Sequence, residues 1–159
     1  MTNYSTYVDW RRTFHQYPEL SDEEYETTEK LRKILKSYGI RILEVPLKTG
    51  LVAEIGQGEE MIAVRTDIDA LPIEEQVKHE FTSKYQGAMH ACGHDIHMAS
   101  ILATGIQLKE IEDELNGRVR LIFQPAEELG HGAFEIINTG VLKGAKAVLG
   151  FHNYPTLKV

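Results

Sequence analysis

The chain has 159 residues, of which 42% are hydrophobic and 26% are charged, and this composition is typical of one soluble globular domain with a buried core. Its formal net charge of −7 argues against binding to nucleic acid or to an anionic membrane surface, because either would repel the chain. No apolar run is long enough to cross a membrane, so a membrane partner is not expected.

Two helices are expected at the start of the chain. The first covers residues 4–17 and ends at Pro18. The second begins after Ser21, which we expect to be its N-cap because Glu24 follows at the spacing of a capping box, and it ends near Gly39. The first 17 residues contain no apolar signal core, and we therefore expect a cytoplasmic protein.

The remainder of the sequence alternates short strands with helices. The segments 51–55 and 61–66 are apolar and are separated by glycines, which predicts a hairpin. The further elements expected are a helix over about 95–115, a strand over 118–123, a helix over 132–138 and a buried strand over 145–151. This order predicts an α/β protein with a layered mixed sheet and helices on both faces.

Three of the expected strands are followed by acidic or imidazole side chains. Asp67 and Asp69 follow one strand, Glu127 and Glu128 a second, and His152 a third. Ligands of open α/β sheets bind beyond the carboxyl ends of the strands. We therefore expect these side chains to gather at one edge of the sheet.

The loop before the helix at 95–115 adds two metal-binding residue types. It contains Cys92, the only cysteine of the chain, and His94. Thiolate and imidazole groups suit zinc and similar metals. The side chains also have ordinary explanations when they are taken singly, since a lone cysteine is often a small buried residue and adjacent glutamates often form an exposed acidic run. A cysteine hydrolase with Cys92 as nucleophile and a nearby histidine as base also remains open.

Three segments together resemble a known family. They are RTDIDALP at 65–72, MHACGHDIH at 89–97 and FQPAEE at 123–128, and the segment RTFHQYPEL at 12–20 adds to them. They resemble the amidohydrolase branch of the aminoacylase and carboxypeptidase-G2-like metallopeptidases. That branch includes hippurate hydrolases, N-acyl-amino-acid amidohydrolases, N-acetyldiaminopimelate deacetylases and plant auxin-conjugate hydrolases.

The resemblance implies a zinc-exopeptidase-like catalytic domain and a role for each motif residue. The residues that match the metal ligands of the family are Cys92, His94, Glu128 and His152. Glu127 matches the general acid/base. The residues expected to orient the ligands from outside the metal shell are Asp67, Asp95 and His97.

The resemblance also implies the reaction and its cofactor. The expected activity is metal-dependent hydrolysis of the amide bond of a small N-acyl amino acid or peptide. One or two divalent ions would be bound, with zinc or manganese expected and nickel or cobalt also compatible. Glu127 would take a proton from water and return it to the leaving amine.

Members of the family are much longer than this chain. They insert a lid or dimerisation domain and then complete the catalytic domain with one more histidine ligand. Residues 1–159 are therefore expected to be the N-terminal part of the catalytic domain, without the lid and the C-terminal remainder. An inactive metal-binding fragment is the alternative for the isolated chain, and a full-length form is compatible with a homo-oligomer. His131 replaces part of a glycine-rich stretch, which makes it a candidate to face the substrate cleft.

Overall fold

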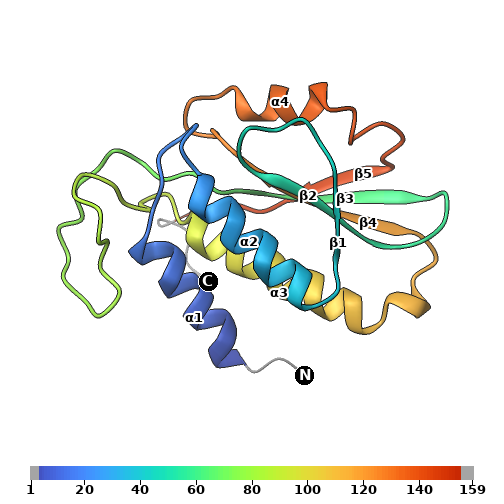
Figure 1. The fold of residues 1–159 in the computed structure, drawn as a ribbon, viewed down its shortest axis with the longest axis horizontal. Coiled ribbons are helices and arrows are strands. Elements are labelled where there is room, and N and C mark those ends of the chain that lie inside the picture. Colours follow the sequence, from blue (N-terminus) through green and yellow to red (C-terminus); the bar gives the residue numbers. More distant parts are fainter. Residues whose placement is uncertain (1–3, 155–159) are drawn as a thin grey trace.

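A computed structural model describes residues 4–154, which form a five-stranded sheet with helices on both faces (Figure 1). The strands are β1 (Arg41–Leu43), β2 (Leu51–Gly56), β3 (Met61–Asp67), β4 (Arg118–Gln124) and β5 (Ala147–Gly150). Their order in the sheet is β1-β2-β4-β3-β5. β3 is parallel to β4 and β5, whereas β2 is antiparallel to β1 and β4. The predicted layered mixed sheet is confirmed.

Two helices pack directly on one face of the sheet, a third packs against one of them on the same side, and one helix lies on the other face (Figure 1). They are α1 (Tyr4–Gln16), α2 (Tyr25–Ser37) and α3 (His94–Glu110) on the first face, and α4 (Gly132–Asn138) on the second. α3 approaches the sheet closely at Gly105, where an added Cβ would lie 2.5 Å from Leu121 Cδ1. Both faces of the central strands are therefore covered, and all six residues of β2 are buried.

The predicted hairpin of β2 and β3 is wrong. β4 lies between these two strands and pairs with both. Gly56 has a positive φ of 82°, and a Cβ there would lie 2.3 Å from the carbonyl oxygen of Gly117. This glycine therefore allows close approach of the segment that leads into β4, which a local turn signal does not reveal.

The expected N-cap of the second helix is also wrong. α2 begins at Tyr25, and its N-cap residue Glu24 does not cap it with its side chain. The carboxylate of Glu19 accepts the N–H groups of Glu26 and Thr27 in the first turn, at 3.1 and 2.6 Å. The hydroxyl of Ser21 instead donates a hydrogen bond of 2.7 Å to Asp69 Oδ2, beyond the end of β3. At Ser21, a contact with a distant segment therefore stands in place of the predicted cap.

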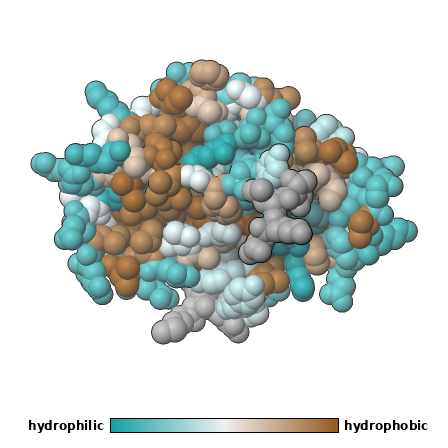
Figure 2. Space-filling view, turned by 180° about the vertical axis from the view of Figure 1, so that it is seen from behind, coloured by the Kyte–Doolittle hydropathy of each residue, from teal (hydrophilic) through white to brown (hydrophobic). Residues whose placement is uncertain are grey.

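The last strand differs from the expectation in its burial. All four residues of β5 are exposed, because β5 forms the edge of the sheet and pairs only with β3. The side opposite to that seen in Figure 1 carries a broad hydrophobic area (Figure 2).

The predicted helix over 95–115 is shorter than expected, since α3 ends at Glu110 and a 3-10 turn, η1 (Glu112–Glu114), follows. No helix within residues 4–154 has the length and hydropathy needed to span a membrane.

Candidate metal centre

The candidate site lies at the carboxyl ends of three neighbouring parallel strands. β4, β3 and β5 are adjacent in the sheet and run in the same direction. Asp67 ends β3, the two glutamates Glu127 and Glu128 follow β4, and His152 follows β5. The expectation that these segments meet at one edge is therefore met by the topology.

Cys92, His94 and Glu128 form the centre of this cluster. Each of these three residues offers one potential ligand atom, and the three atoms lie within 4.8 Å of one another. His94 Nε2 is 3.8 Å from Glu128 Oε1. His94 donates from Nδ1 to the carbonyl oxygen of Asp69 at 2.8 Å, so in the neutral imidazole, which is the form that binds a metal, Nε2 presents a lone pair. Within the described residues, His94 Nε2 and Glu128 Oε1 are buried without a hydrogen-bond partner. Two converging buried acceptors of this kind are costly unless a cation or a donor binds them.

His152 extends the cluster on the side of Cys92. Its Nε2 lies 3.5 Å from Cys92 Sγ, while its Nδ1 donates to the carbonyl oxygen of Asn153 at 2.6 Å. His152 belongs to a second group of potential ligand atoms, together with Asp67, His94 and His97. The four expected ligands thus lie side by side in two overlapping groups that share His94, rather than around one common point.

Asp67 and His97 already use their polar atoms within the protein. Asp67 Oδ1 accepts a 2.7 Å hydrogen bond from His97 Nδ1, and its Oδ2 accepts one of 2.9 Å from Arg65. His97 Nε2 accepts the backbone N–H of Asn153 at 2.9 Å. His97 therefore connects the end of β3 to the backbone next to His152.

Asp95 is turned away from this cluster and joins α3 to α1. Its Oδ2 lies 2.8 Å from His15 Nδ1 and 2.8 Å from Arg11 Nε. His15 Nε2 in turn lies 3.0 Å from Glu75 Oε1. Asp95 thus fixes the start of α3, where His94 lies, through contacts with another helix.

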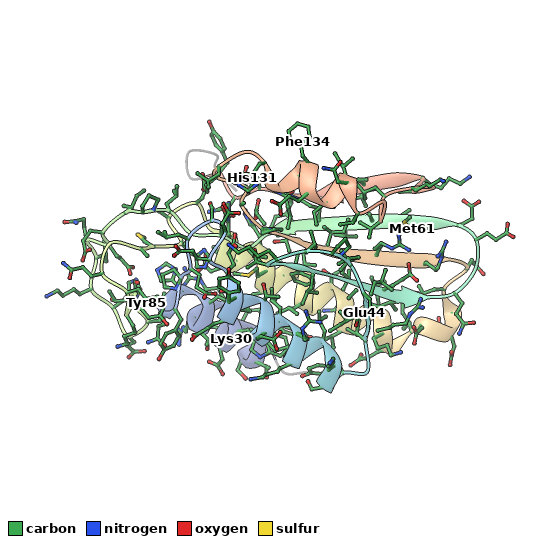
Figure 3. All side chains as sticks on the ribbon, turned by 45° about the horizontal axis from the view of Figure 1, so that its top comes forward. Lys30, Glu44, Met61, Tyr85, His131 and Phe134 are labelled. Carbon is green, nitrogen blue, oxygen red and sulfur yellow. The ribbon has the colours of Figure 1, made fainter. Side chains whose placement is uncertain are left out.

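Glu127 and His131 occupy different surroundings. Glu127 Oε2 is 3.8 Å from His94 Nε2, and a third of the Glu127 side chain, 34%, is exposed. His131 precedes α4 (Figure 3) and lies between two carboxylates, with Nε2 3.1 Å from Asp22 and Nδ1 3.2 Å from Glu135. These contacts hold His131 outside both groups of potential ligand atoms around His94.

Asp69 was expected at this edge of the sheet but was given no role in the site, yet it contacts two of the expected ligands, His94 and Glu128. Its carbonyl oxygen accepts the Nδ1 proton of His94, and its Oδ2 accepts the backbone N–H of Glu128 at 2.9 Å and the hydroxyl of Ser21. Burial alone would raise the pKa of Asp69, but the hydrogen bonds from His94 and Ser21 outweigh it and lower the pKa to about 2. The sequence signal for this role was the spacing of Asp67, the last residue of β3, and Asp69, because residues i and i+2 of an extended chain lie on the same side.

The electrostatic field of the cluster favours a cation. Burial and the carboxylate of Glu128 raise the pKa of the Cys92 thiol to about 11. Burial opposes the charged form of His94, but Asp69 and Asp67 outweigh it and raise the pKa of this imidazole. Neighbouring carboxylates contribute to both shifts, after burial in the case of Cys92, and negative charge of this kind stabilises a divalent cation. The same field disfavours a free thiolate at Cys92.

Known proteins resemble this chain over nearly its whole length. It is 52% identical to an N-acetylcysteine deacetylase of Bacillus subtilis over 155 residues, which cover 96% of this chain and 41% of that protein. It is 42% identical to an N-acyl-L-amino acid amidohydrolase of Geobacillus stearothermophilus, with 95% of this chain and 42% of the relative covered. The chain therefore spans about two fifths of the length of these relatives.

A solved structure and a family model agree with these relatives. The YXEP protein of Bacillus subtilis, described as a dinuclear metal binding peptidase from the M20 family, superposes with a TM-score of 0.93. It shares 51% sequence identity, and the superposition covers 96% of this chain and 44% of that one. The model of peptidase family M20/M25/M40 matches residues 63–159, which include every expected ligand and Glu127. The chain belongs to peptidase family M20/M25/M40.

Proposed function

We propose that this chain is the metal-binding part of a hydrolase that cleaves the amide bond of N-acyl amino acids or small peptides. The observation that carries the proposal is the pair of buried, unpartnered atoms His94 Nε2 and Glu128 Oε1, 3.8 Å apart beside Cys92. Ligands of one ion are separated by about 3–4 Å when each bond is about 2.0–2.3 Å long. A thiolate, an imidazole and a carboxylate together suit a zinc ion, and the carboxylate is also a ligand type for manganese.

The proposed ligands are Cys92, His94, Glu128 and His152. They would hold one or two divalent ions, with zinc or manganese expected. Such an ion acidifies water and polarises the substrate carbonyl, which is the chemistry that amide hydrolysis needs. Asp69 orients His94, while Asp67 and His97 hold the backbone beside His152, so the donor atoms stay in place when substrate enters.

Glu127 is proposed as the general acid/base. It neighbours Glu128 in sequence, but it is partly exposed and faces His94 at 3.8 Å. A carboxylate in this position can accept a proton from the attacking water and return it to the amine nitrogen that leaves. Glu128 is then free for binding the ion, so the two adjacent carboxylates have different tasks.

The substrate class is inferred from the relatives. An N-acetylcysteine deacetylase and an N-acyl-L-amino acid amidohydrolase are both named for acylated amino acids. Removal of an acyl group from an amino acid is the shared chemistry. We extend it to this chain as the proposed reaction, with the acyl group left open.

The cysteine hydrolase is the rival function with an observation in its favour, since Cys92 Sγ lies 3.5 Å from His152 Nε2. It is less favoured, because burial and Glu128 raise the pKa of the thiol to about 11. A thiol enzyme needs the thiolate as its nucleophile.

The test is a metal analysis combined with a substrate screen on a complete protein that contains this sequence. Acetyl-, benzoyl- and succinyl-amino acids would be assayed before and after treatment with a chelator. We expect hydrolysis that is lost on chelation and restored by zinc or manganese. Activity that survives full removal of metal would overturn the proposal and favour the thiol mechanism.

A further inference from the structure

Glu24 is a fully buried carboxylate that lies far from Glu127 in sequence but close to it in the fold. It stands at the start of α2, and its exposure is 0%. Its Oε2 accepts the hydroxyl of Thr49 at 2.7 Å, and its Oε1 accepts the backbone N–H of Ala126 at 2.8 Å. Burial raises the pKa of Glu24 against these hydrogen bonds. A carboxylate is costly to bury, so its two contacts call for an explanation.

The residue that Glu24 holds has an unusual backbone. Ala126 is fully buried and has a positive φ of 46°, although it is not a glycine. Such a conformation costs of order 1 kcal/mol or more, and it persists only where neighbouring groups hold it. Gly132 supplies a second contact by donating its N–H to the carbonyl oxygen of Ala126 at 3.2 Å. An added Cβ at Gly132 would lie 1.7 Å from the carbonyl oxygen of Pro125, so the turn is closely packed.

Ala126 immediately precedes the two glutamates. A second buried carboxylate contacts the backbone on the opposite side of Glu127. Asp69 Oδ2 accepts the N–H of Glu128 and is itself held by Ser21. Ser21 and Glu24 belong to the same segment, which enters α2 next to the chain between β4 and α4 (Figure 1). The amides on either side of Glu127 are therefore fixed by carboxylates from two other parts of the chain.

We propose that Glu24 is a positioning residue, which fixes the Ala126 turn by accepting its N–H and thereby aims Glu127 and Glu128 at the site. The inference rests on the proposed function for its catalytic consequence, but not for the backbone contact itself. Glu24 does not touch the ligand cluster described above. It acts only through the backbone of the turn.

The test compares variants of a complete protein that contains this sequence. Glu24→Ala removes the acceptor of the Ala126 N–H. Glu24→Gln keeps an acceptor, because its amide oxygen can face Ala126 while the hydroxyl of Thr49 rotates to accept from the amide nitrogen. Glu23→Ala is the matched control, since Glu23 is the neighbouring glutamate and its side chain is exposed. Thr49→Val is the milder alternative if Glu24→Ala folds poorly, because it removes only the second contact of the carboxylate.

Two readouts separate positioning from general stability. In Glu24→Ala, we expect faster hydrogen exchange at the Ala126 amide, with the amides of α3 unchanged. We also expect zinc affinity to be weaker by about 10- to 100-fold, as for other residues that orient ligands. Turnover should fall by about 10²-fold with little change in KM, because a displaced base still permits binding. Glu24→Gln should recover most of each property.

The outcomes distinguish failure of the inference from failure of the function. Wild-type exchange at Ala126 in Glu24→Ala would overturn the positioning role, whatever the activity. The role is also overturned if Glu24→Gln is as impaired as Glu24→Ala, or if exchange rises equally throughout the protein. A wild-type protein without metal-dependent amidase activity would instead refute the proposed function, and the exchange measurement would still decide the contact.

Discussion

At the scale of single residues, the two adjacent glutamates are the sharpest test of the proposed roles. Glu128 has a buried carboxylate oxygen without a partner beside His94, whereas Glu127 is partly exposed. In a complete protein that contains this sequence, Glu127→Gln should retain its metal and lose about 10²–10⁴-fold in turnover, because an amide cannot accept the proton. Glu128→Gln should instead bind less metal, because it alters a proposed ligand. Metal content measured beside turnover checks both, and equal metal loss in the two variants would contradict the division of tasks.

His15 offers a residue-scale test that does not depend on the metal. Its nitrogens lie 2.8 Å from Asp95 and 3.0 Å from Glu75, while Arg11 and His79 contact the same carboxylates. Burial opposes the charge on His15, but the carboxylates raise its pKa above the ordinary 6.5. A raised pKa gives stability that is complete below the unfolded-state value and is lost as pH rises through the folded-state value.

The free energy of unfolding should therefore decrease as the pH rises above 6.5, and this decrease should be smaller in His15→Gln. Urea unfolding between mildly acidic and mildly alkaline pH measures the effect. His131→Gln serves as the control, because His131 is also held between two carboxylates but is only partly buried. Parallel pH profiles for the wild type and His15→Gln would show that the ion pairs add no pH-dependent stability.

At the scale of elements, β5 is the exposed edge of the sheet. Val148 and Leu149 are 51% and 53% exposed, because β5 pairs with β3 on one side and has no strand of residues 4–154 on the other. An apolar edge with unpaired backbone groups favours association with other chains. We expect the polypeptide of residues 1–159 to self-associate, and Leu149→Lys to reduce this association. Sedimentation analysis measures it, with Ile111→Lys as a control at an exposed position outside the sheet, 44% exposed.

The helices and strands themselves could largely be predicted from the sequence, whereas their arrangement in the sheet could not. The positions of helices and strands follow local periodicity, and the polar residues after β3, β4 and β5 mark one edge because parallel strands end together. The strand order was not predictable in this way. β4 enters between β2 and β3, and pairing between distant segments leaves no local pattern.

The unpredicted part of the candidate site has the same physical cause. Ser21 and Glu24 have the spacing of a capping box, but both side chains bond to residues far along the chain. Glu128 and Cys92 could be recognised from their motifs, because a carboxylate after a strand and a thiol in the loop before α3 are residue types that bind metals. The contacts that orient them depend on the packed fold.

At the scale of the whole molecule, residues 1–159 provide only part of what the relatives possess. The chain covers 41% of the N-acetylcysteine deacetylase and 44% of the solved dinuclear metal binding peptidase. The family resemblance assigns one further histidine ligand, and a lid, to the portion that these residues do not cover. Within the described chain, His152 is exposed and follows the exposed edge strand β5. A site that lacked this histidine and this lid would admit bulk water, which weakens electrostatic interactions.

We therefore expect the isolated 159-residue polypeptide to bind zinc or manganese weakly. We also expect this polypeptide to turn over substrate at least about 10²-fold more slowly than a protein with a complete site, because misplacement of reacting groups by about 1 Å already costs about 10²-fold in rate. The test is to purify the polypeptide, load it with either metal and assay an N-acyl amino acid. A chimera that continues this sequence with the remaining part of the N-acetylcysteine deacetylase is the comparison, because the identity of 52% makes a compatible interface reasonable. Comparable turnover by the two proteins would show that residues 1–159 already complete the site, and it would overturn the ligand count proposed from the family resemblance.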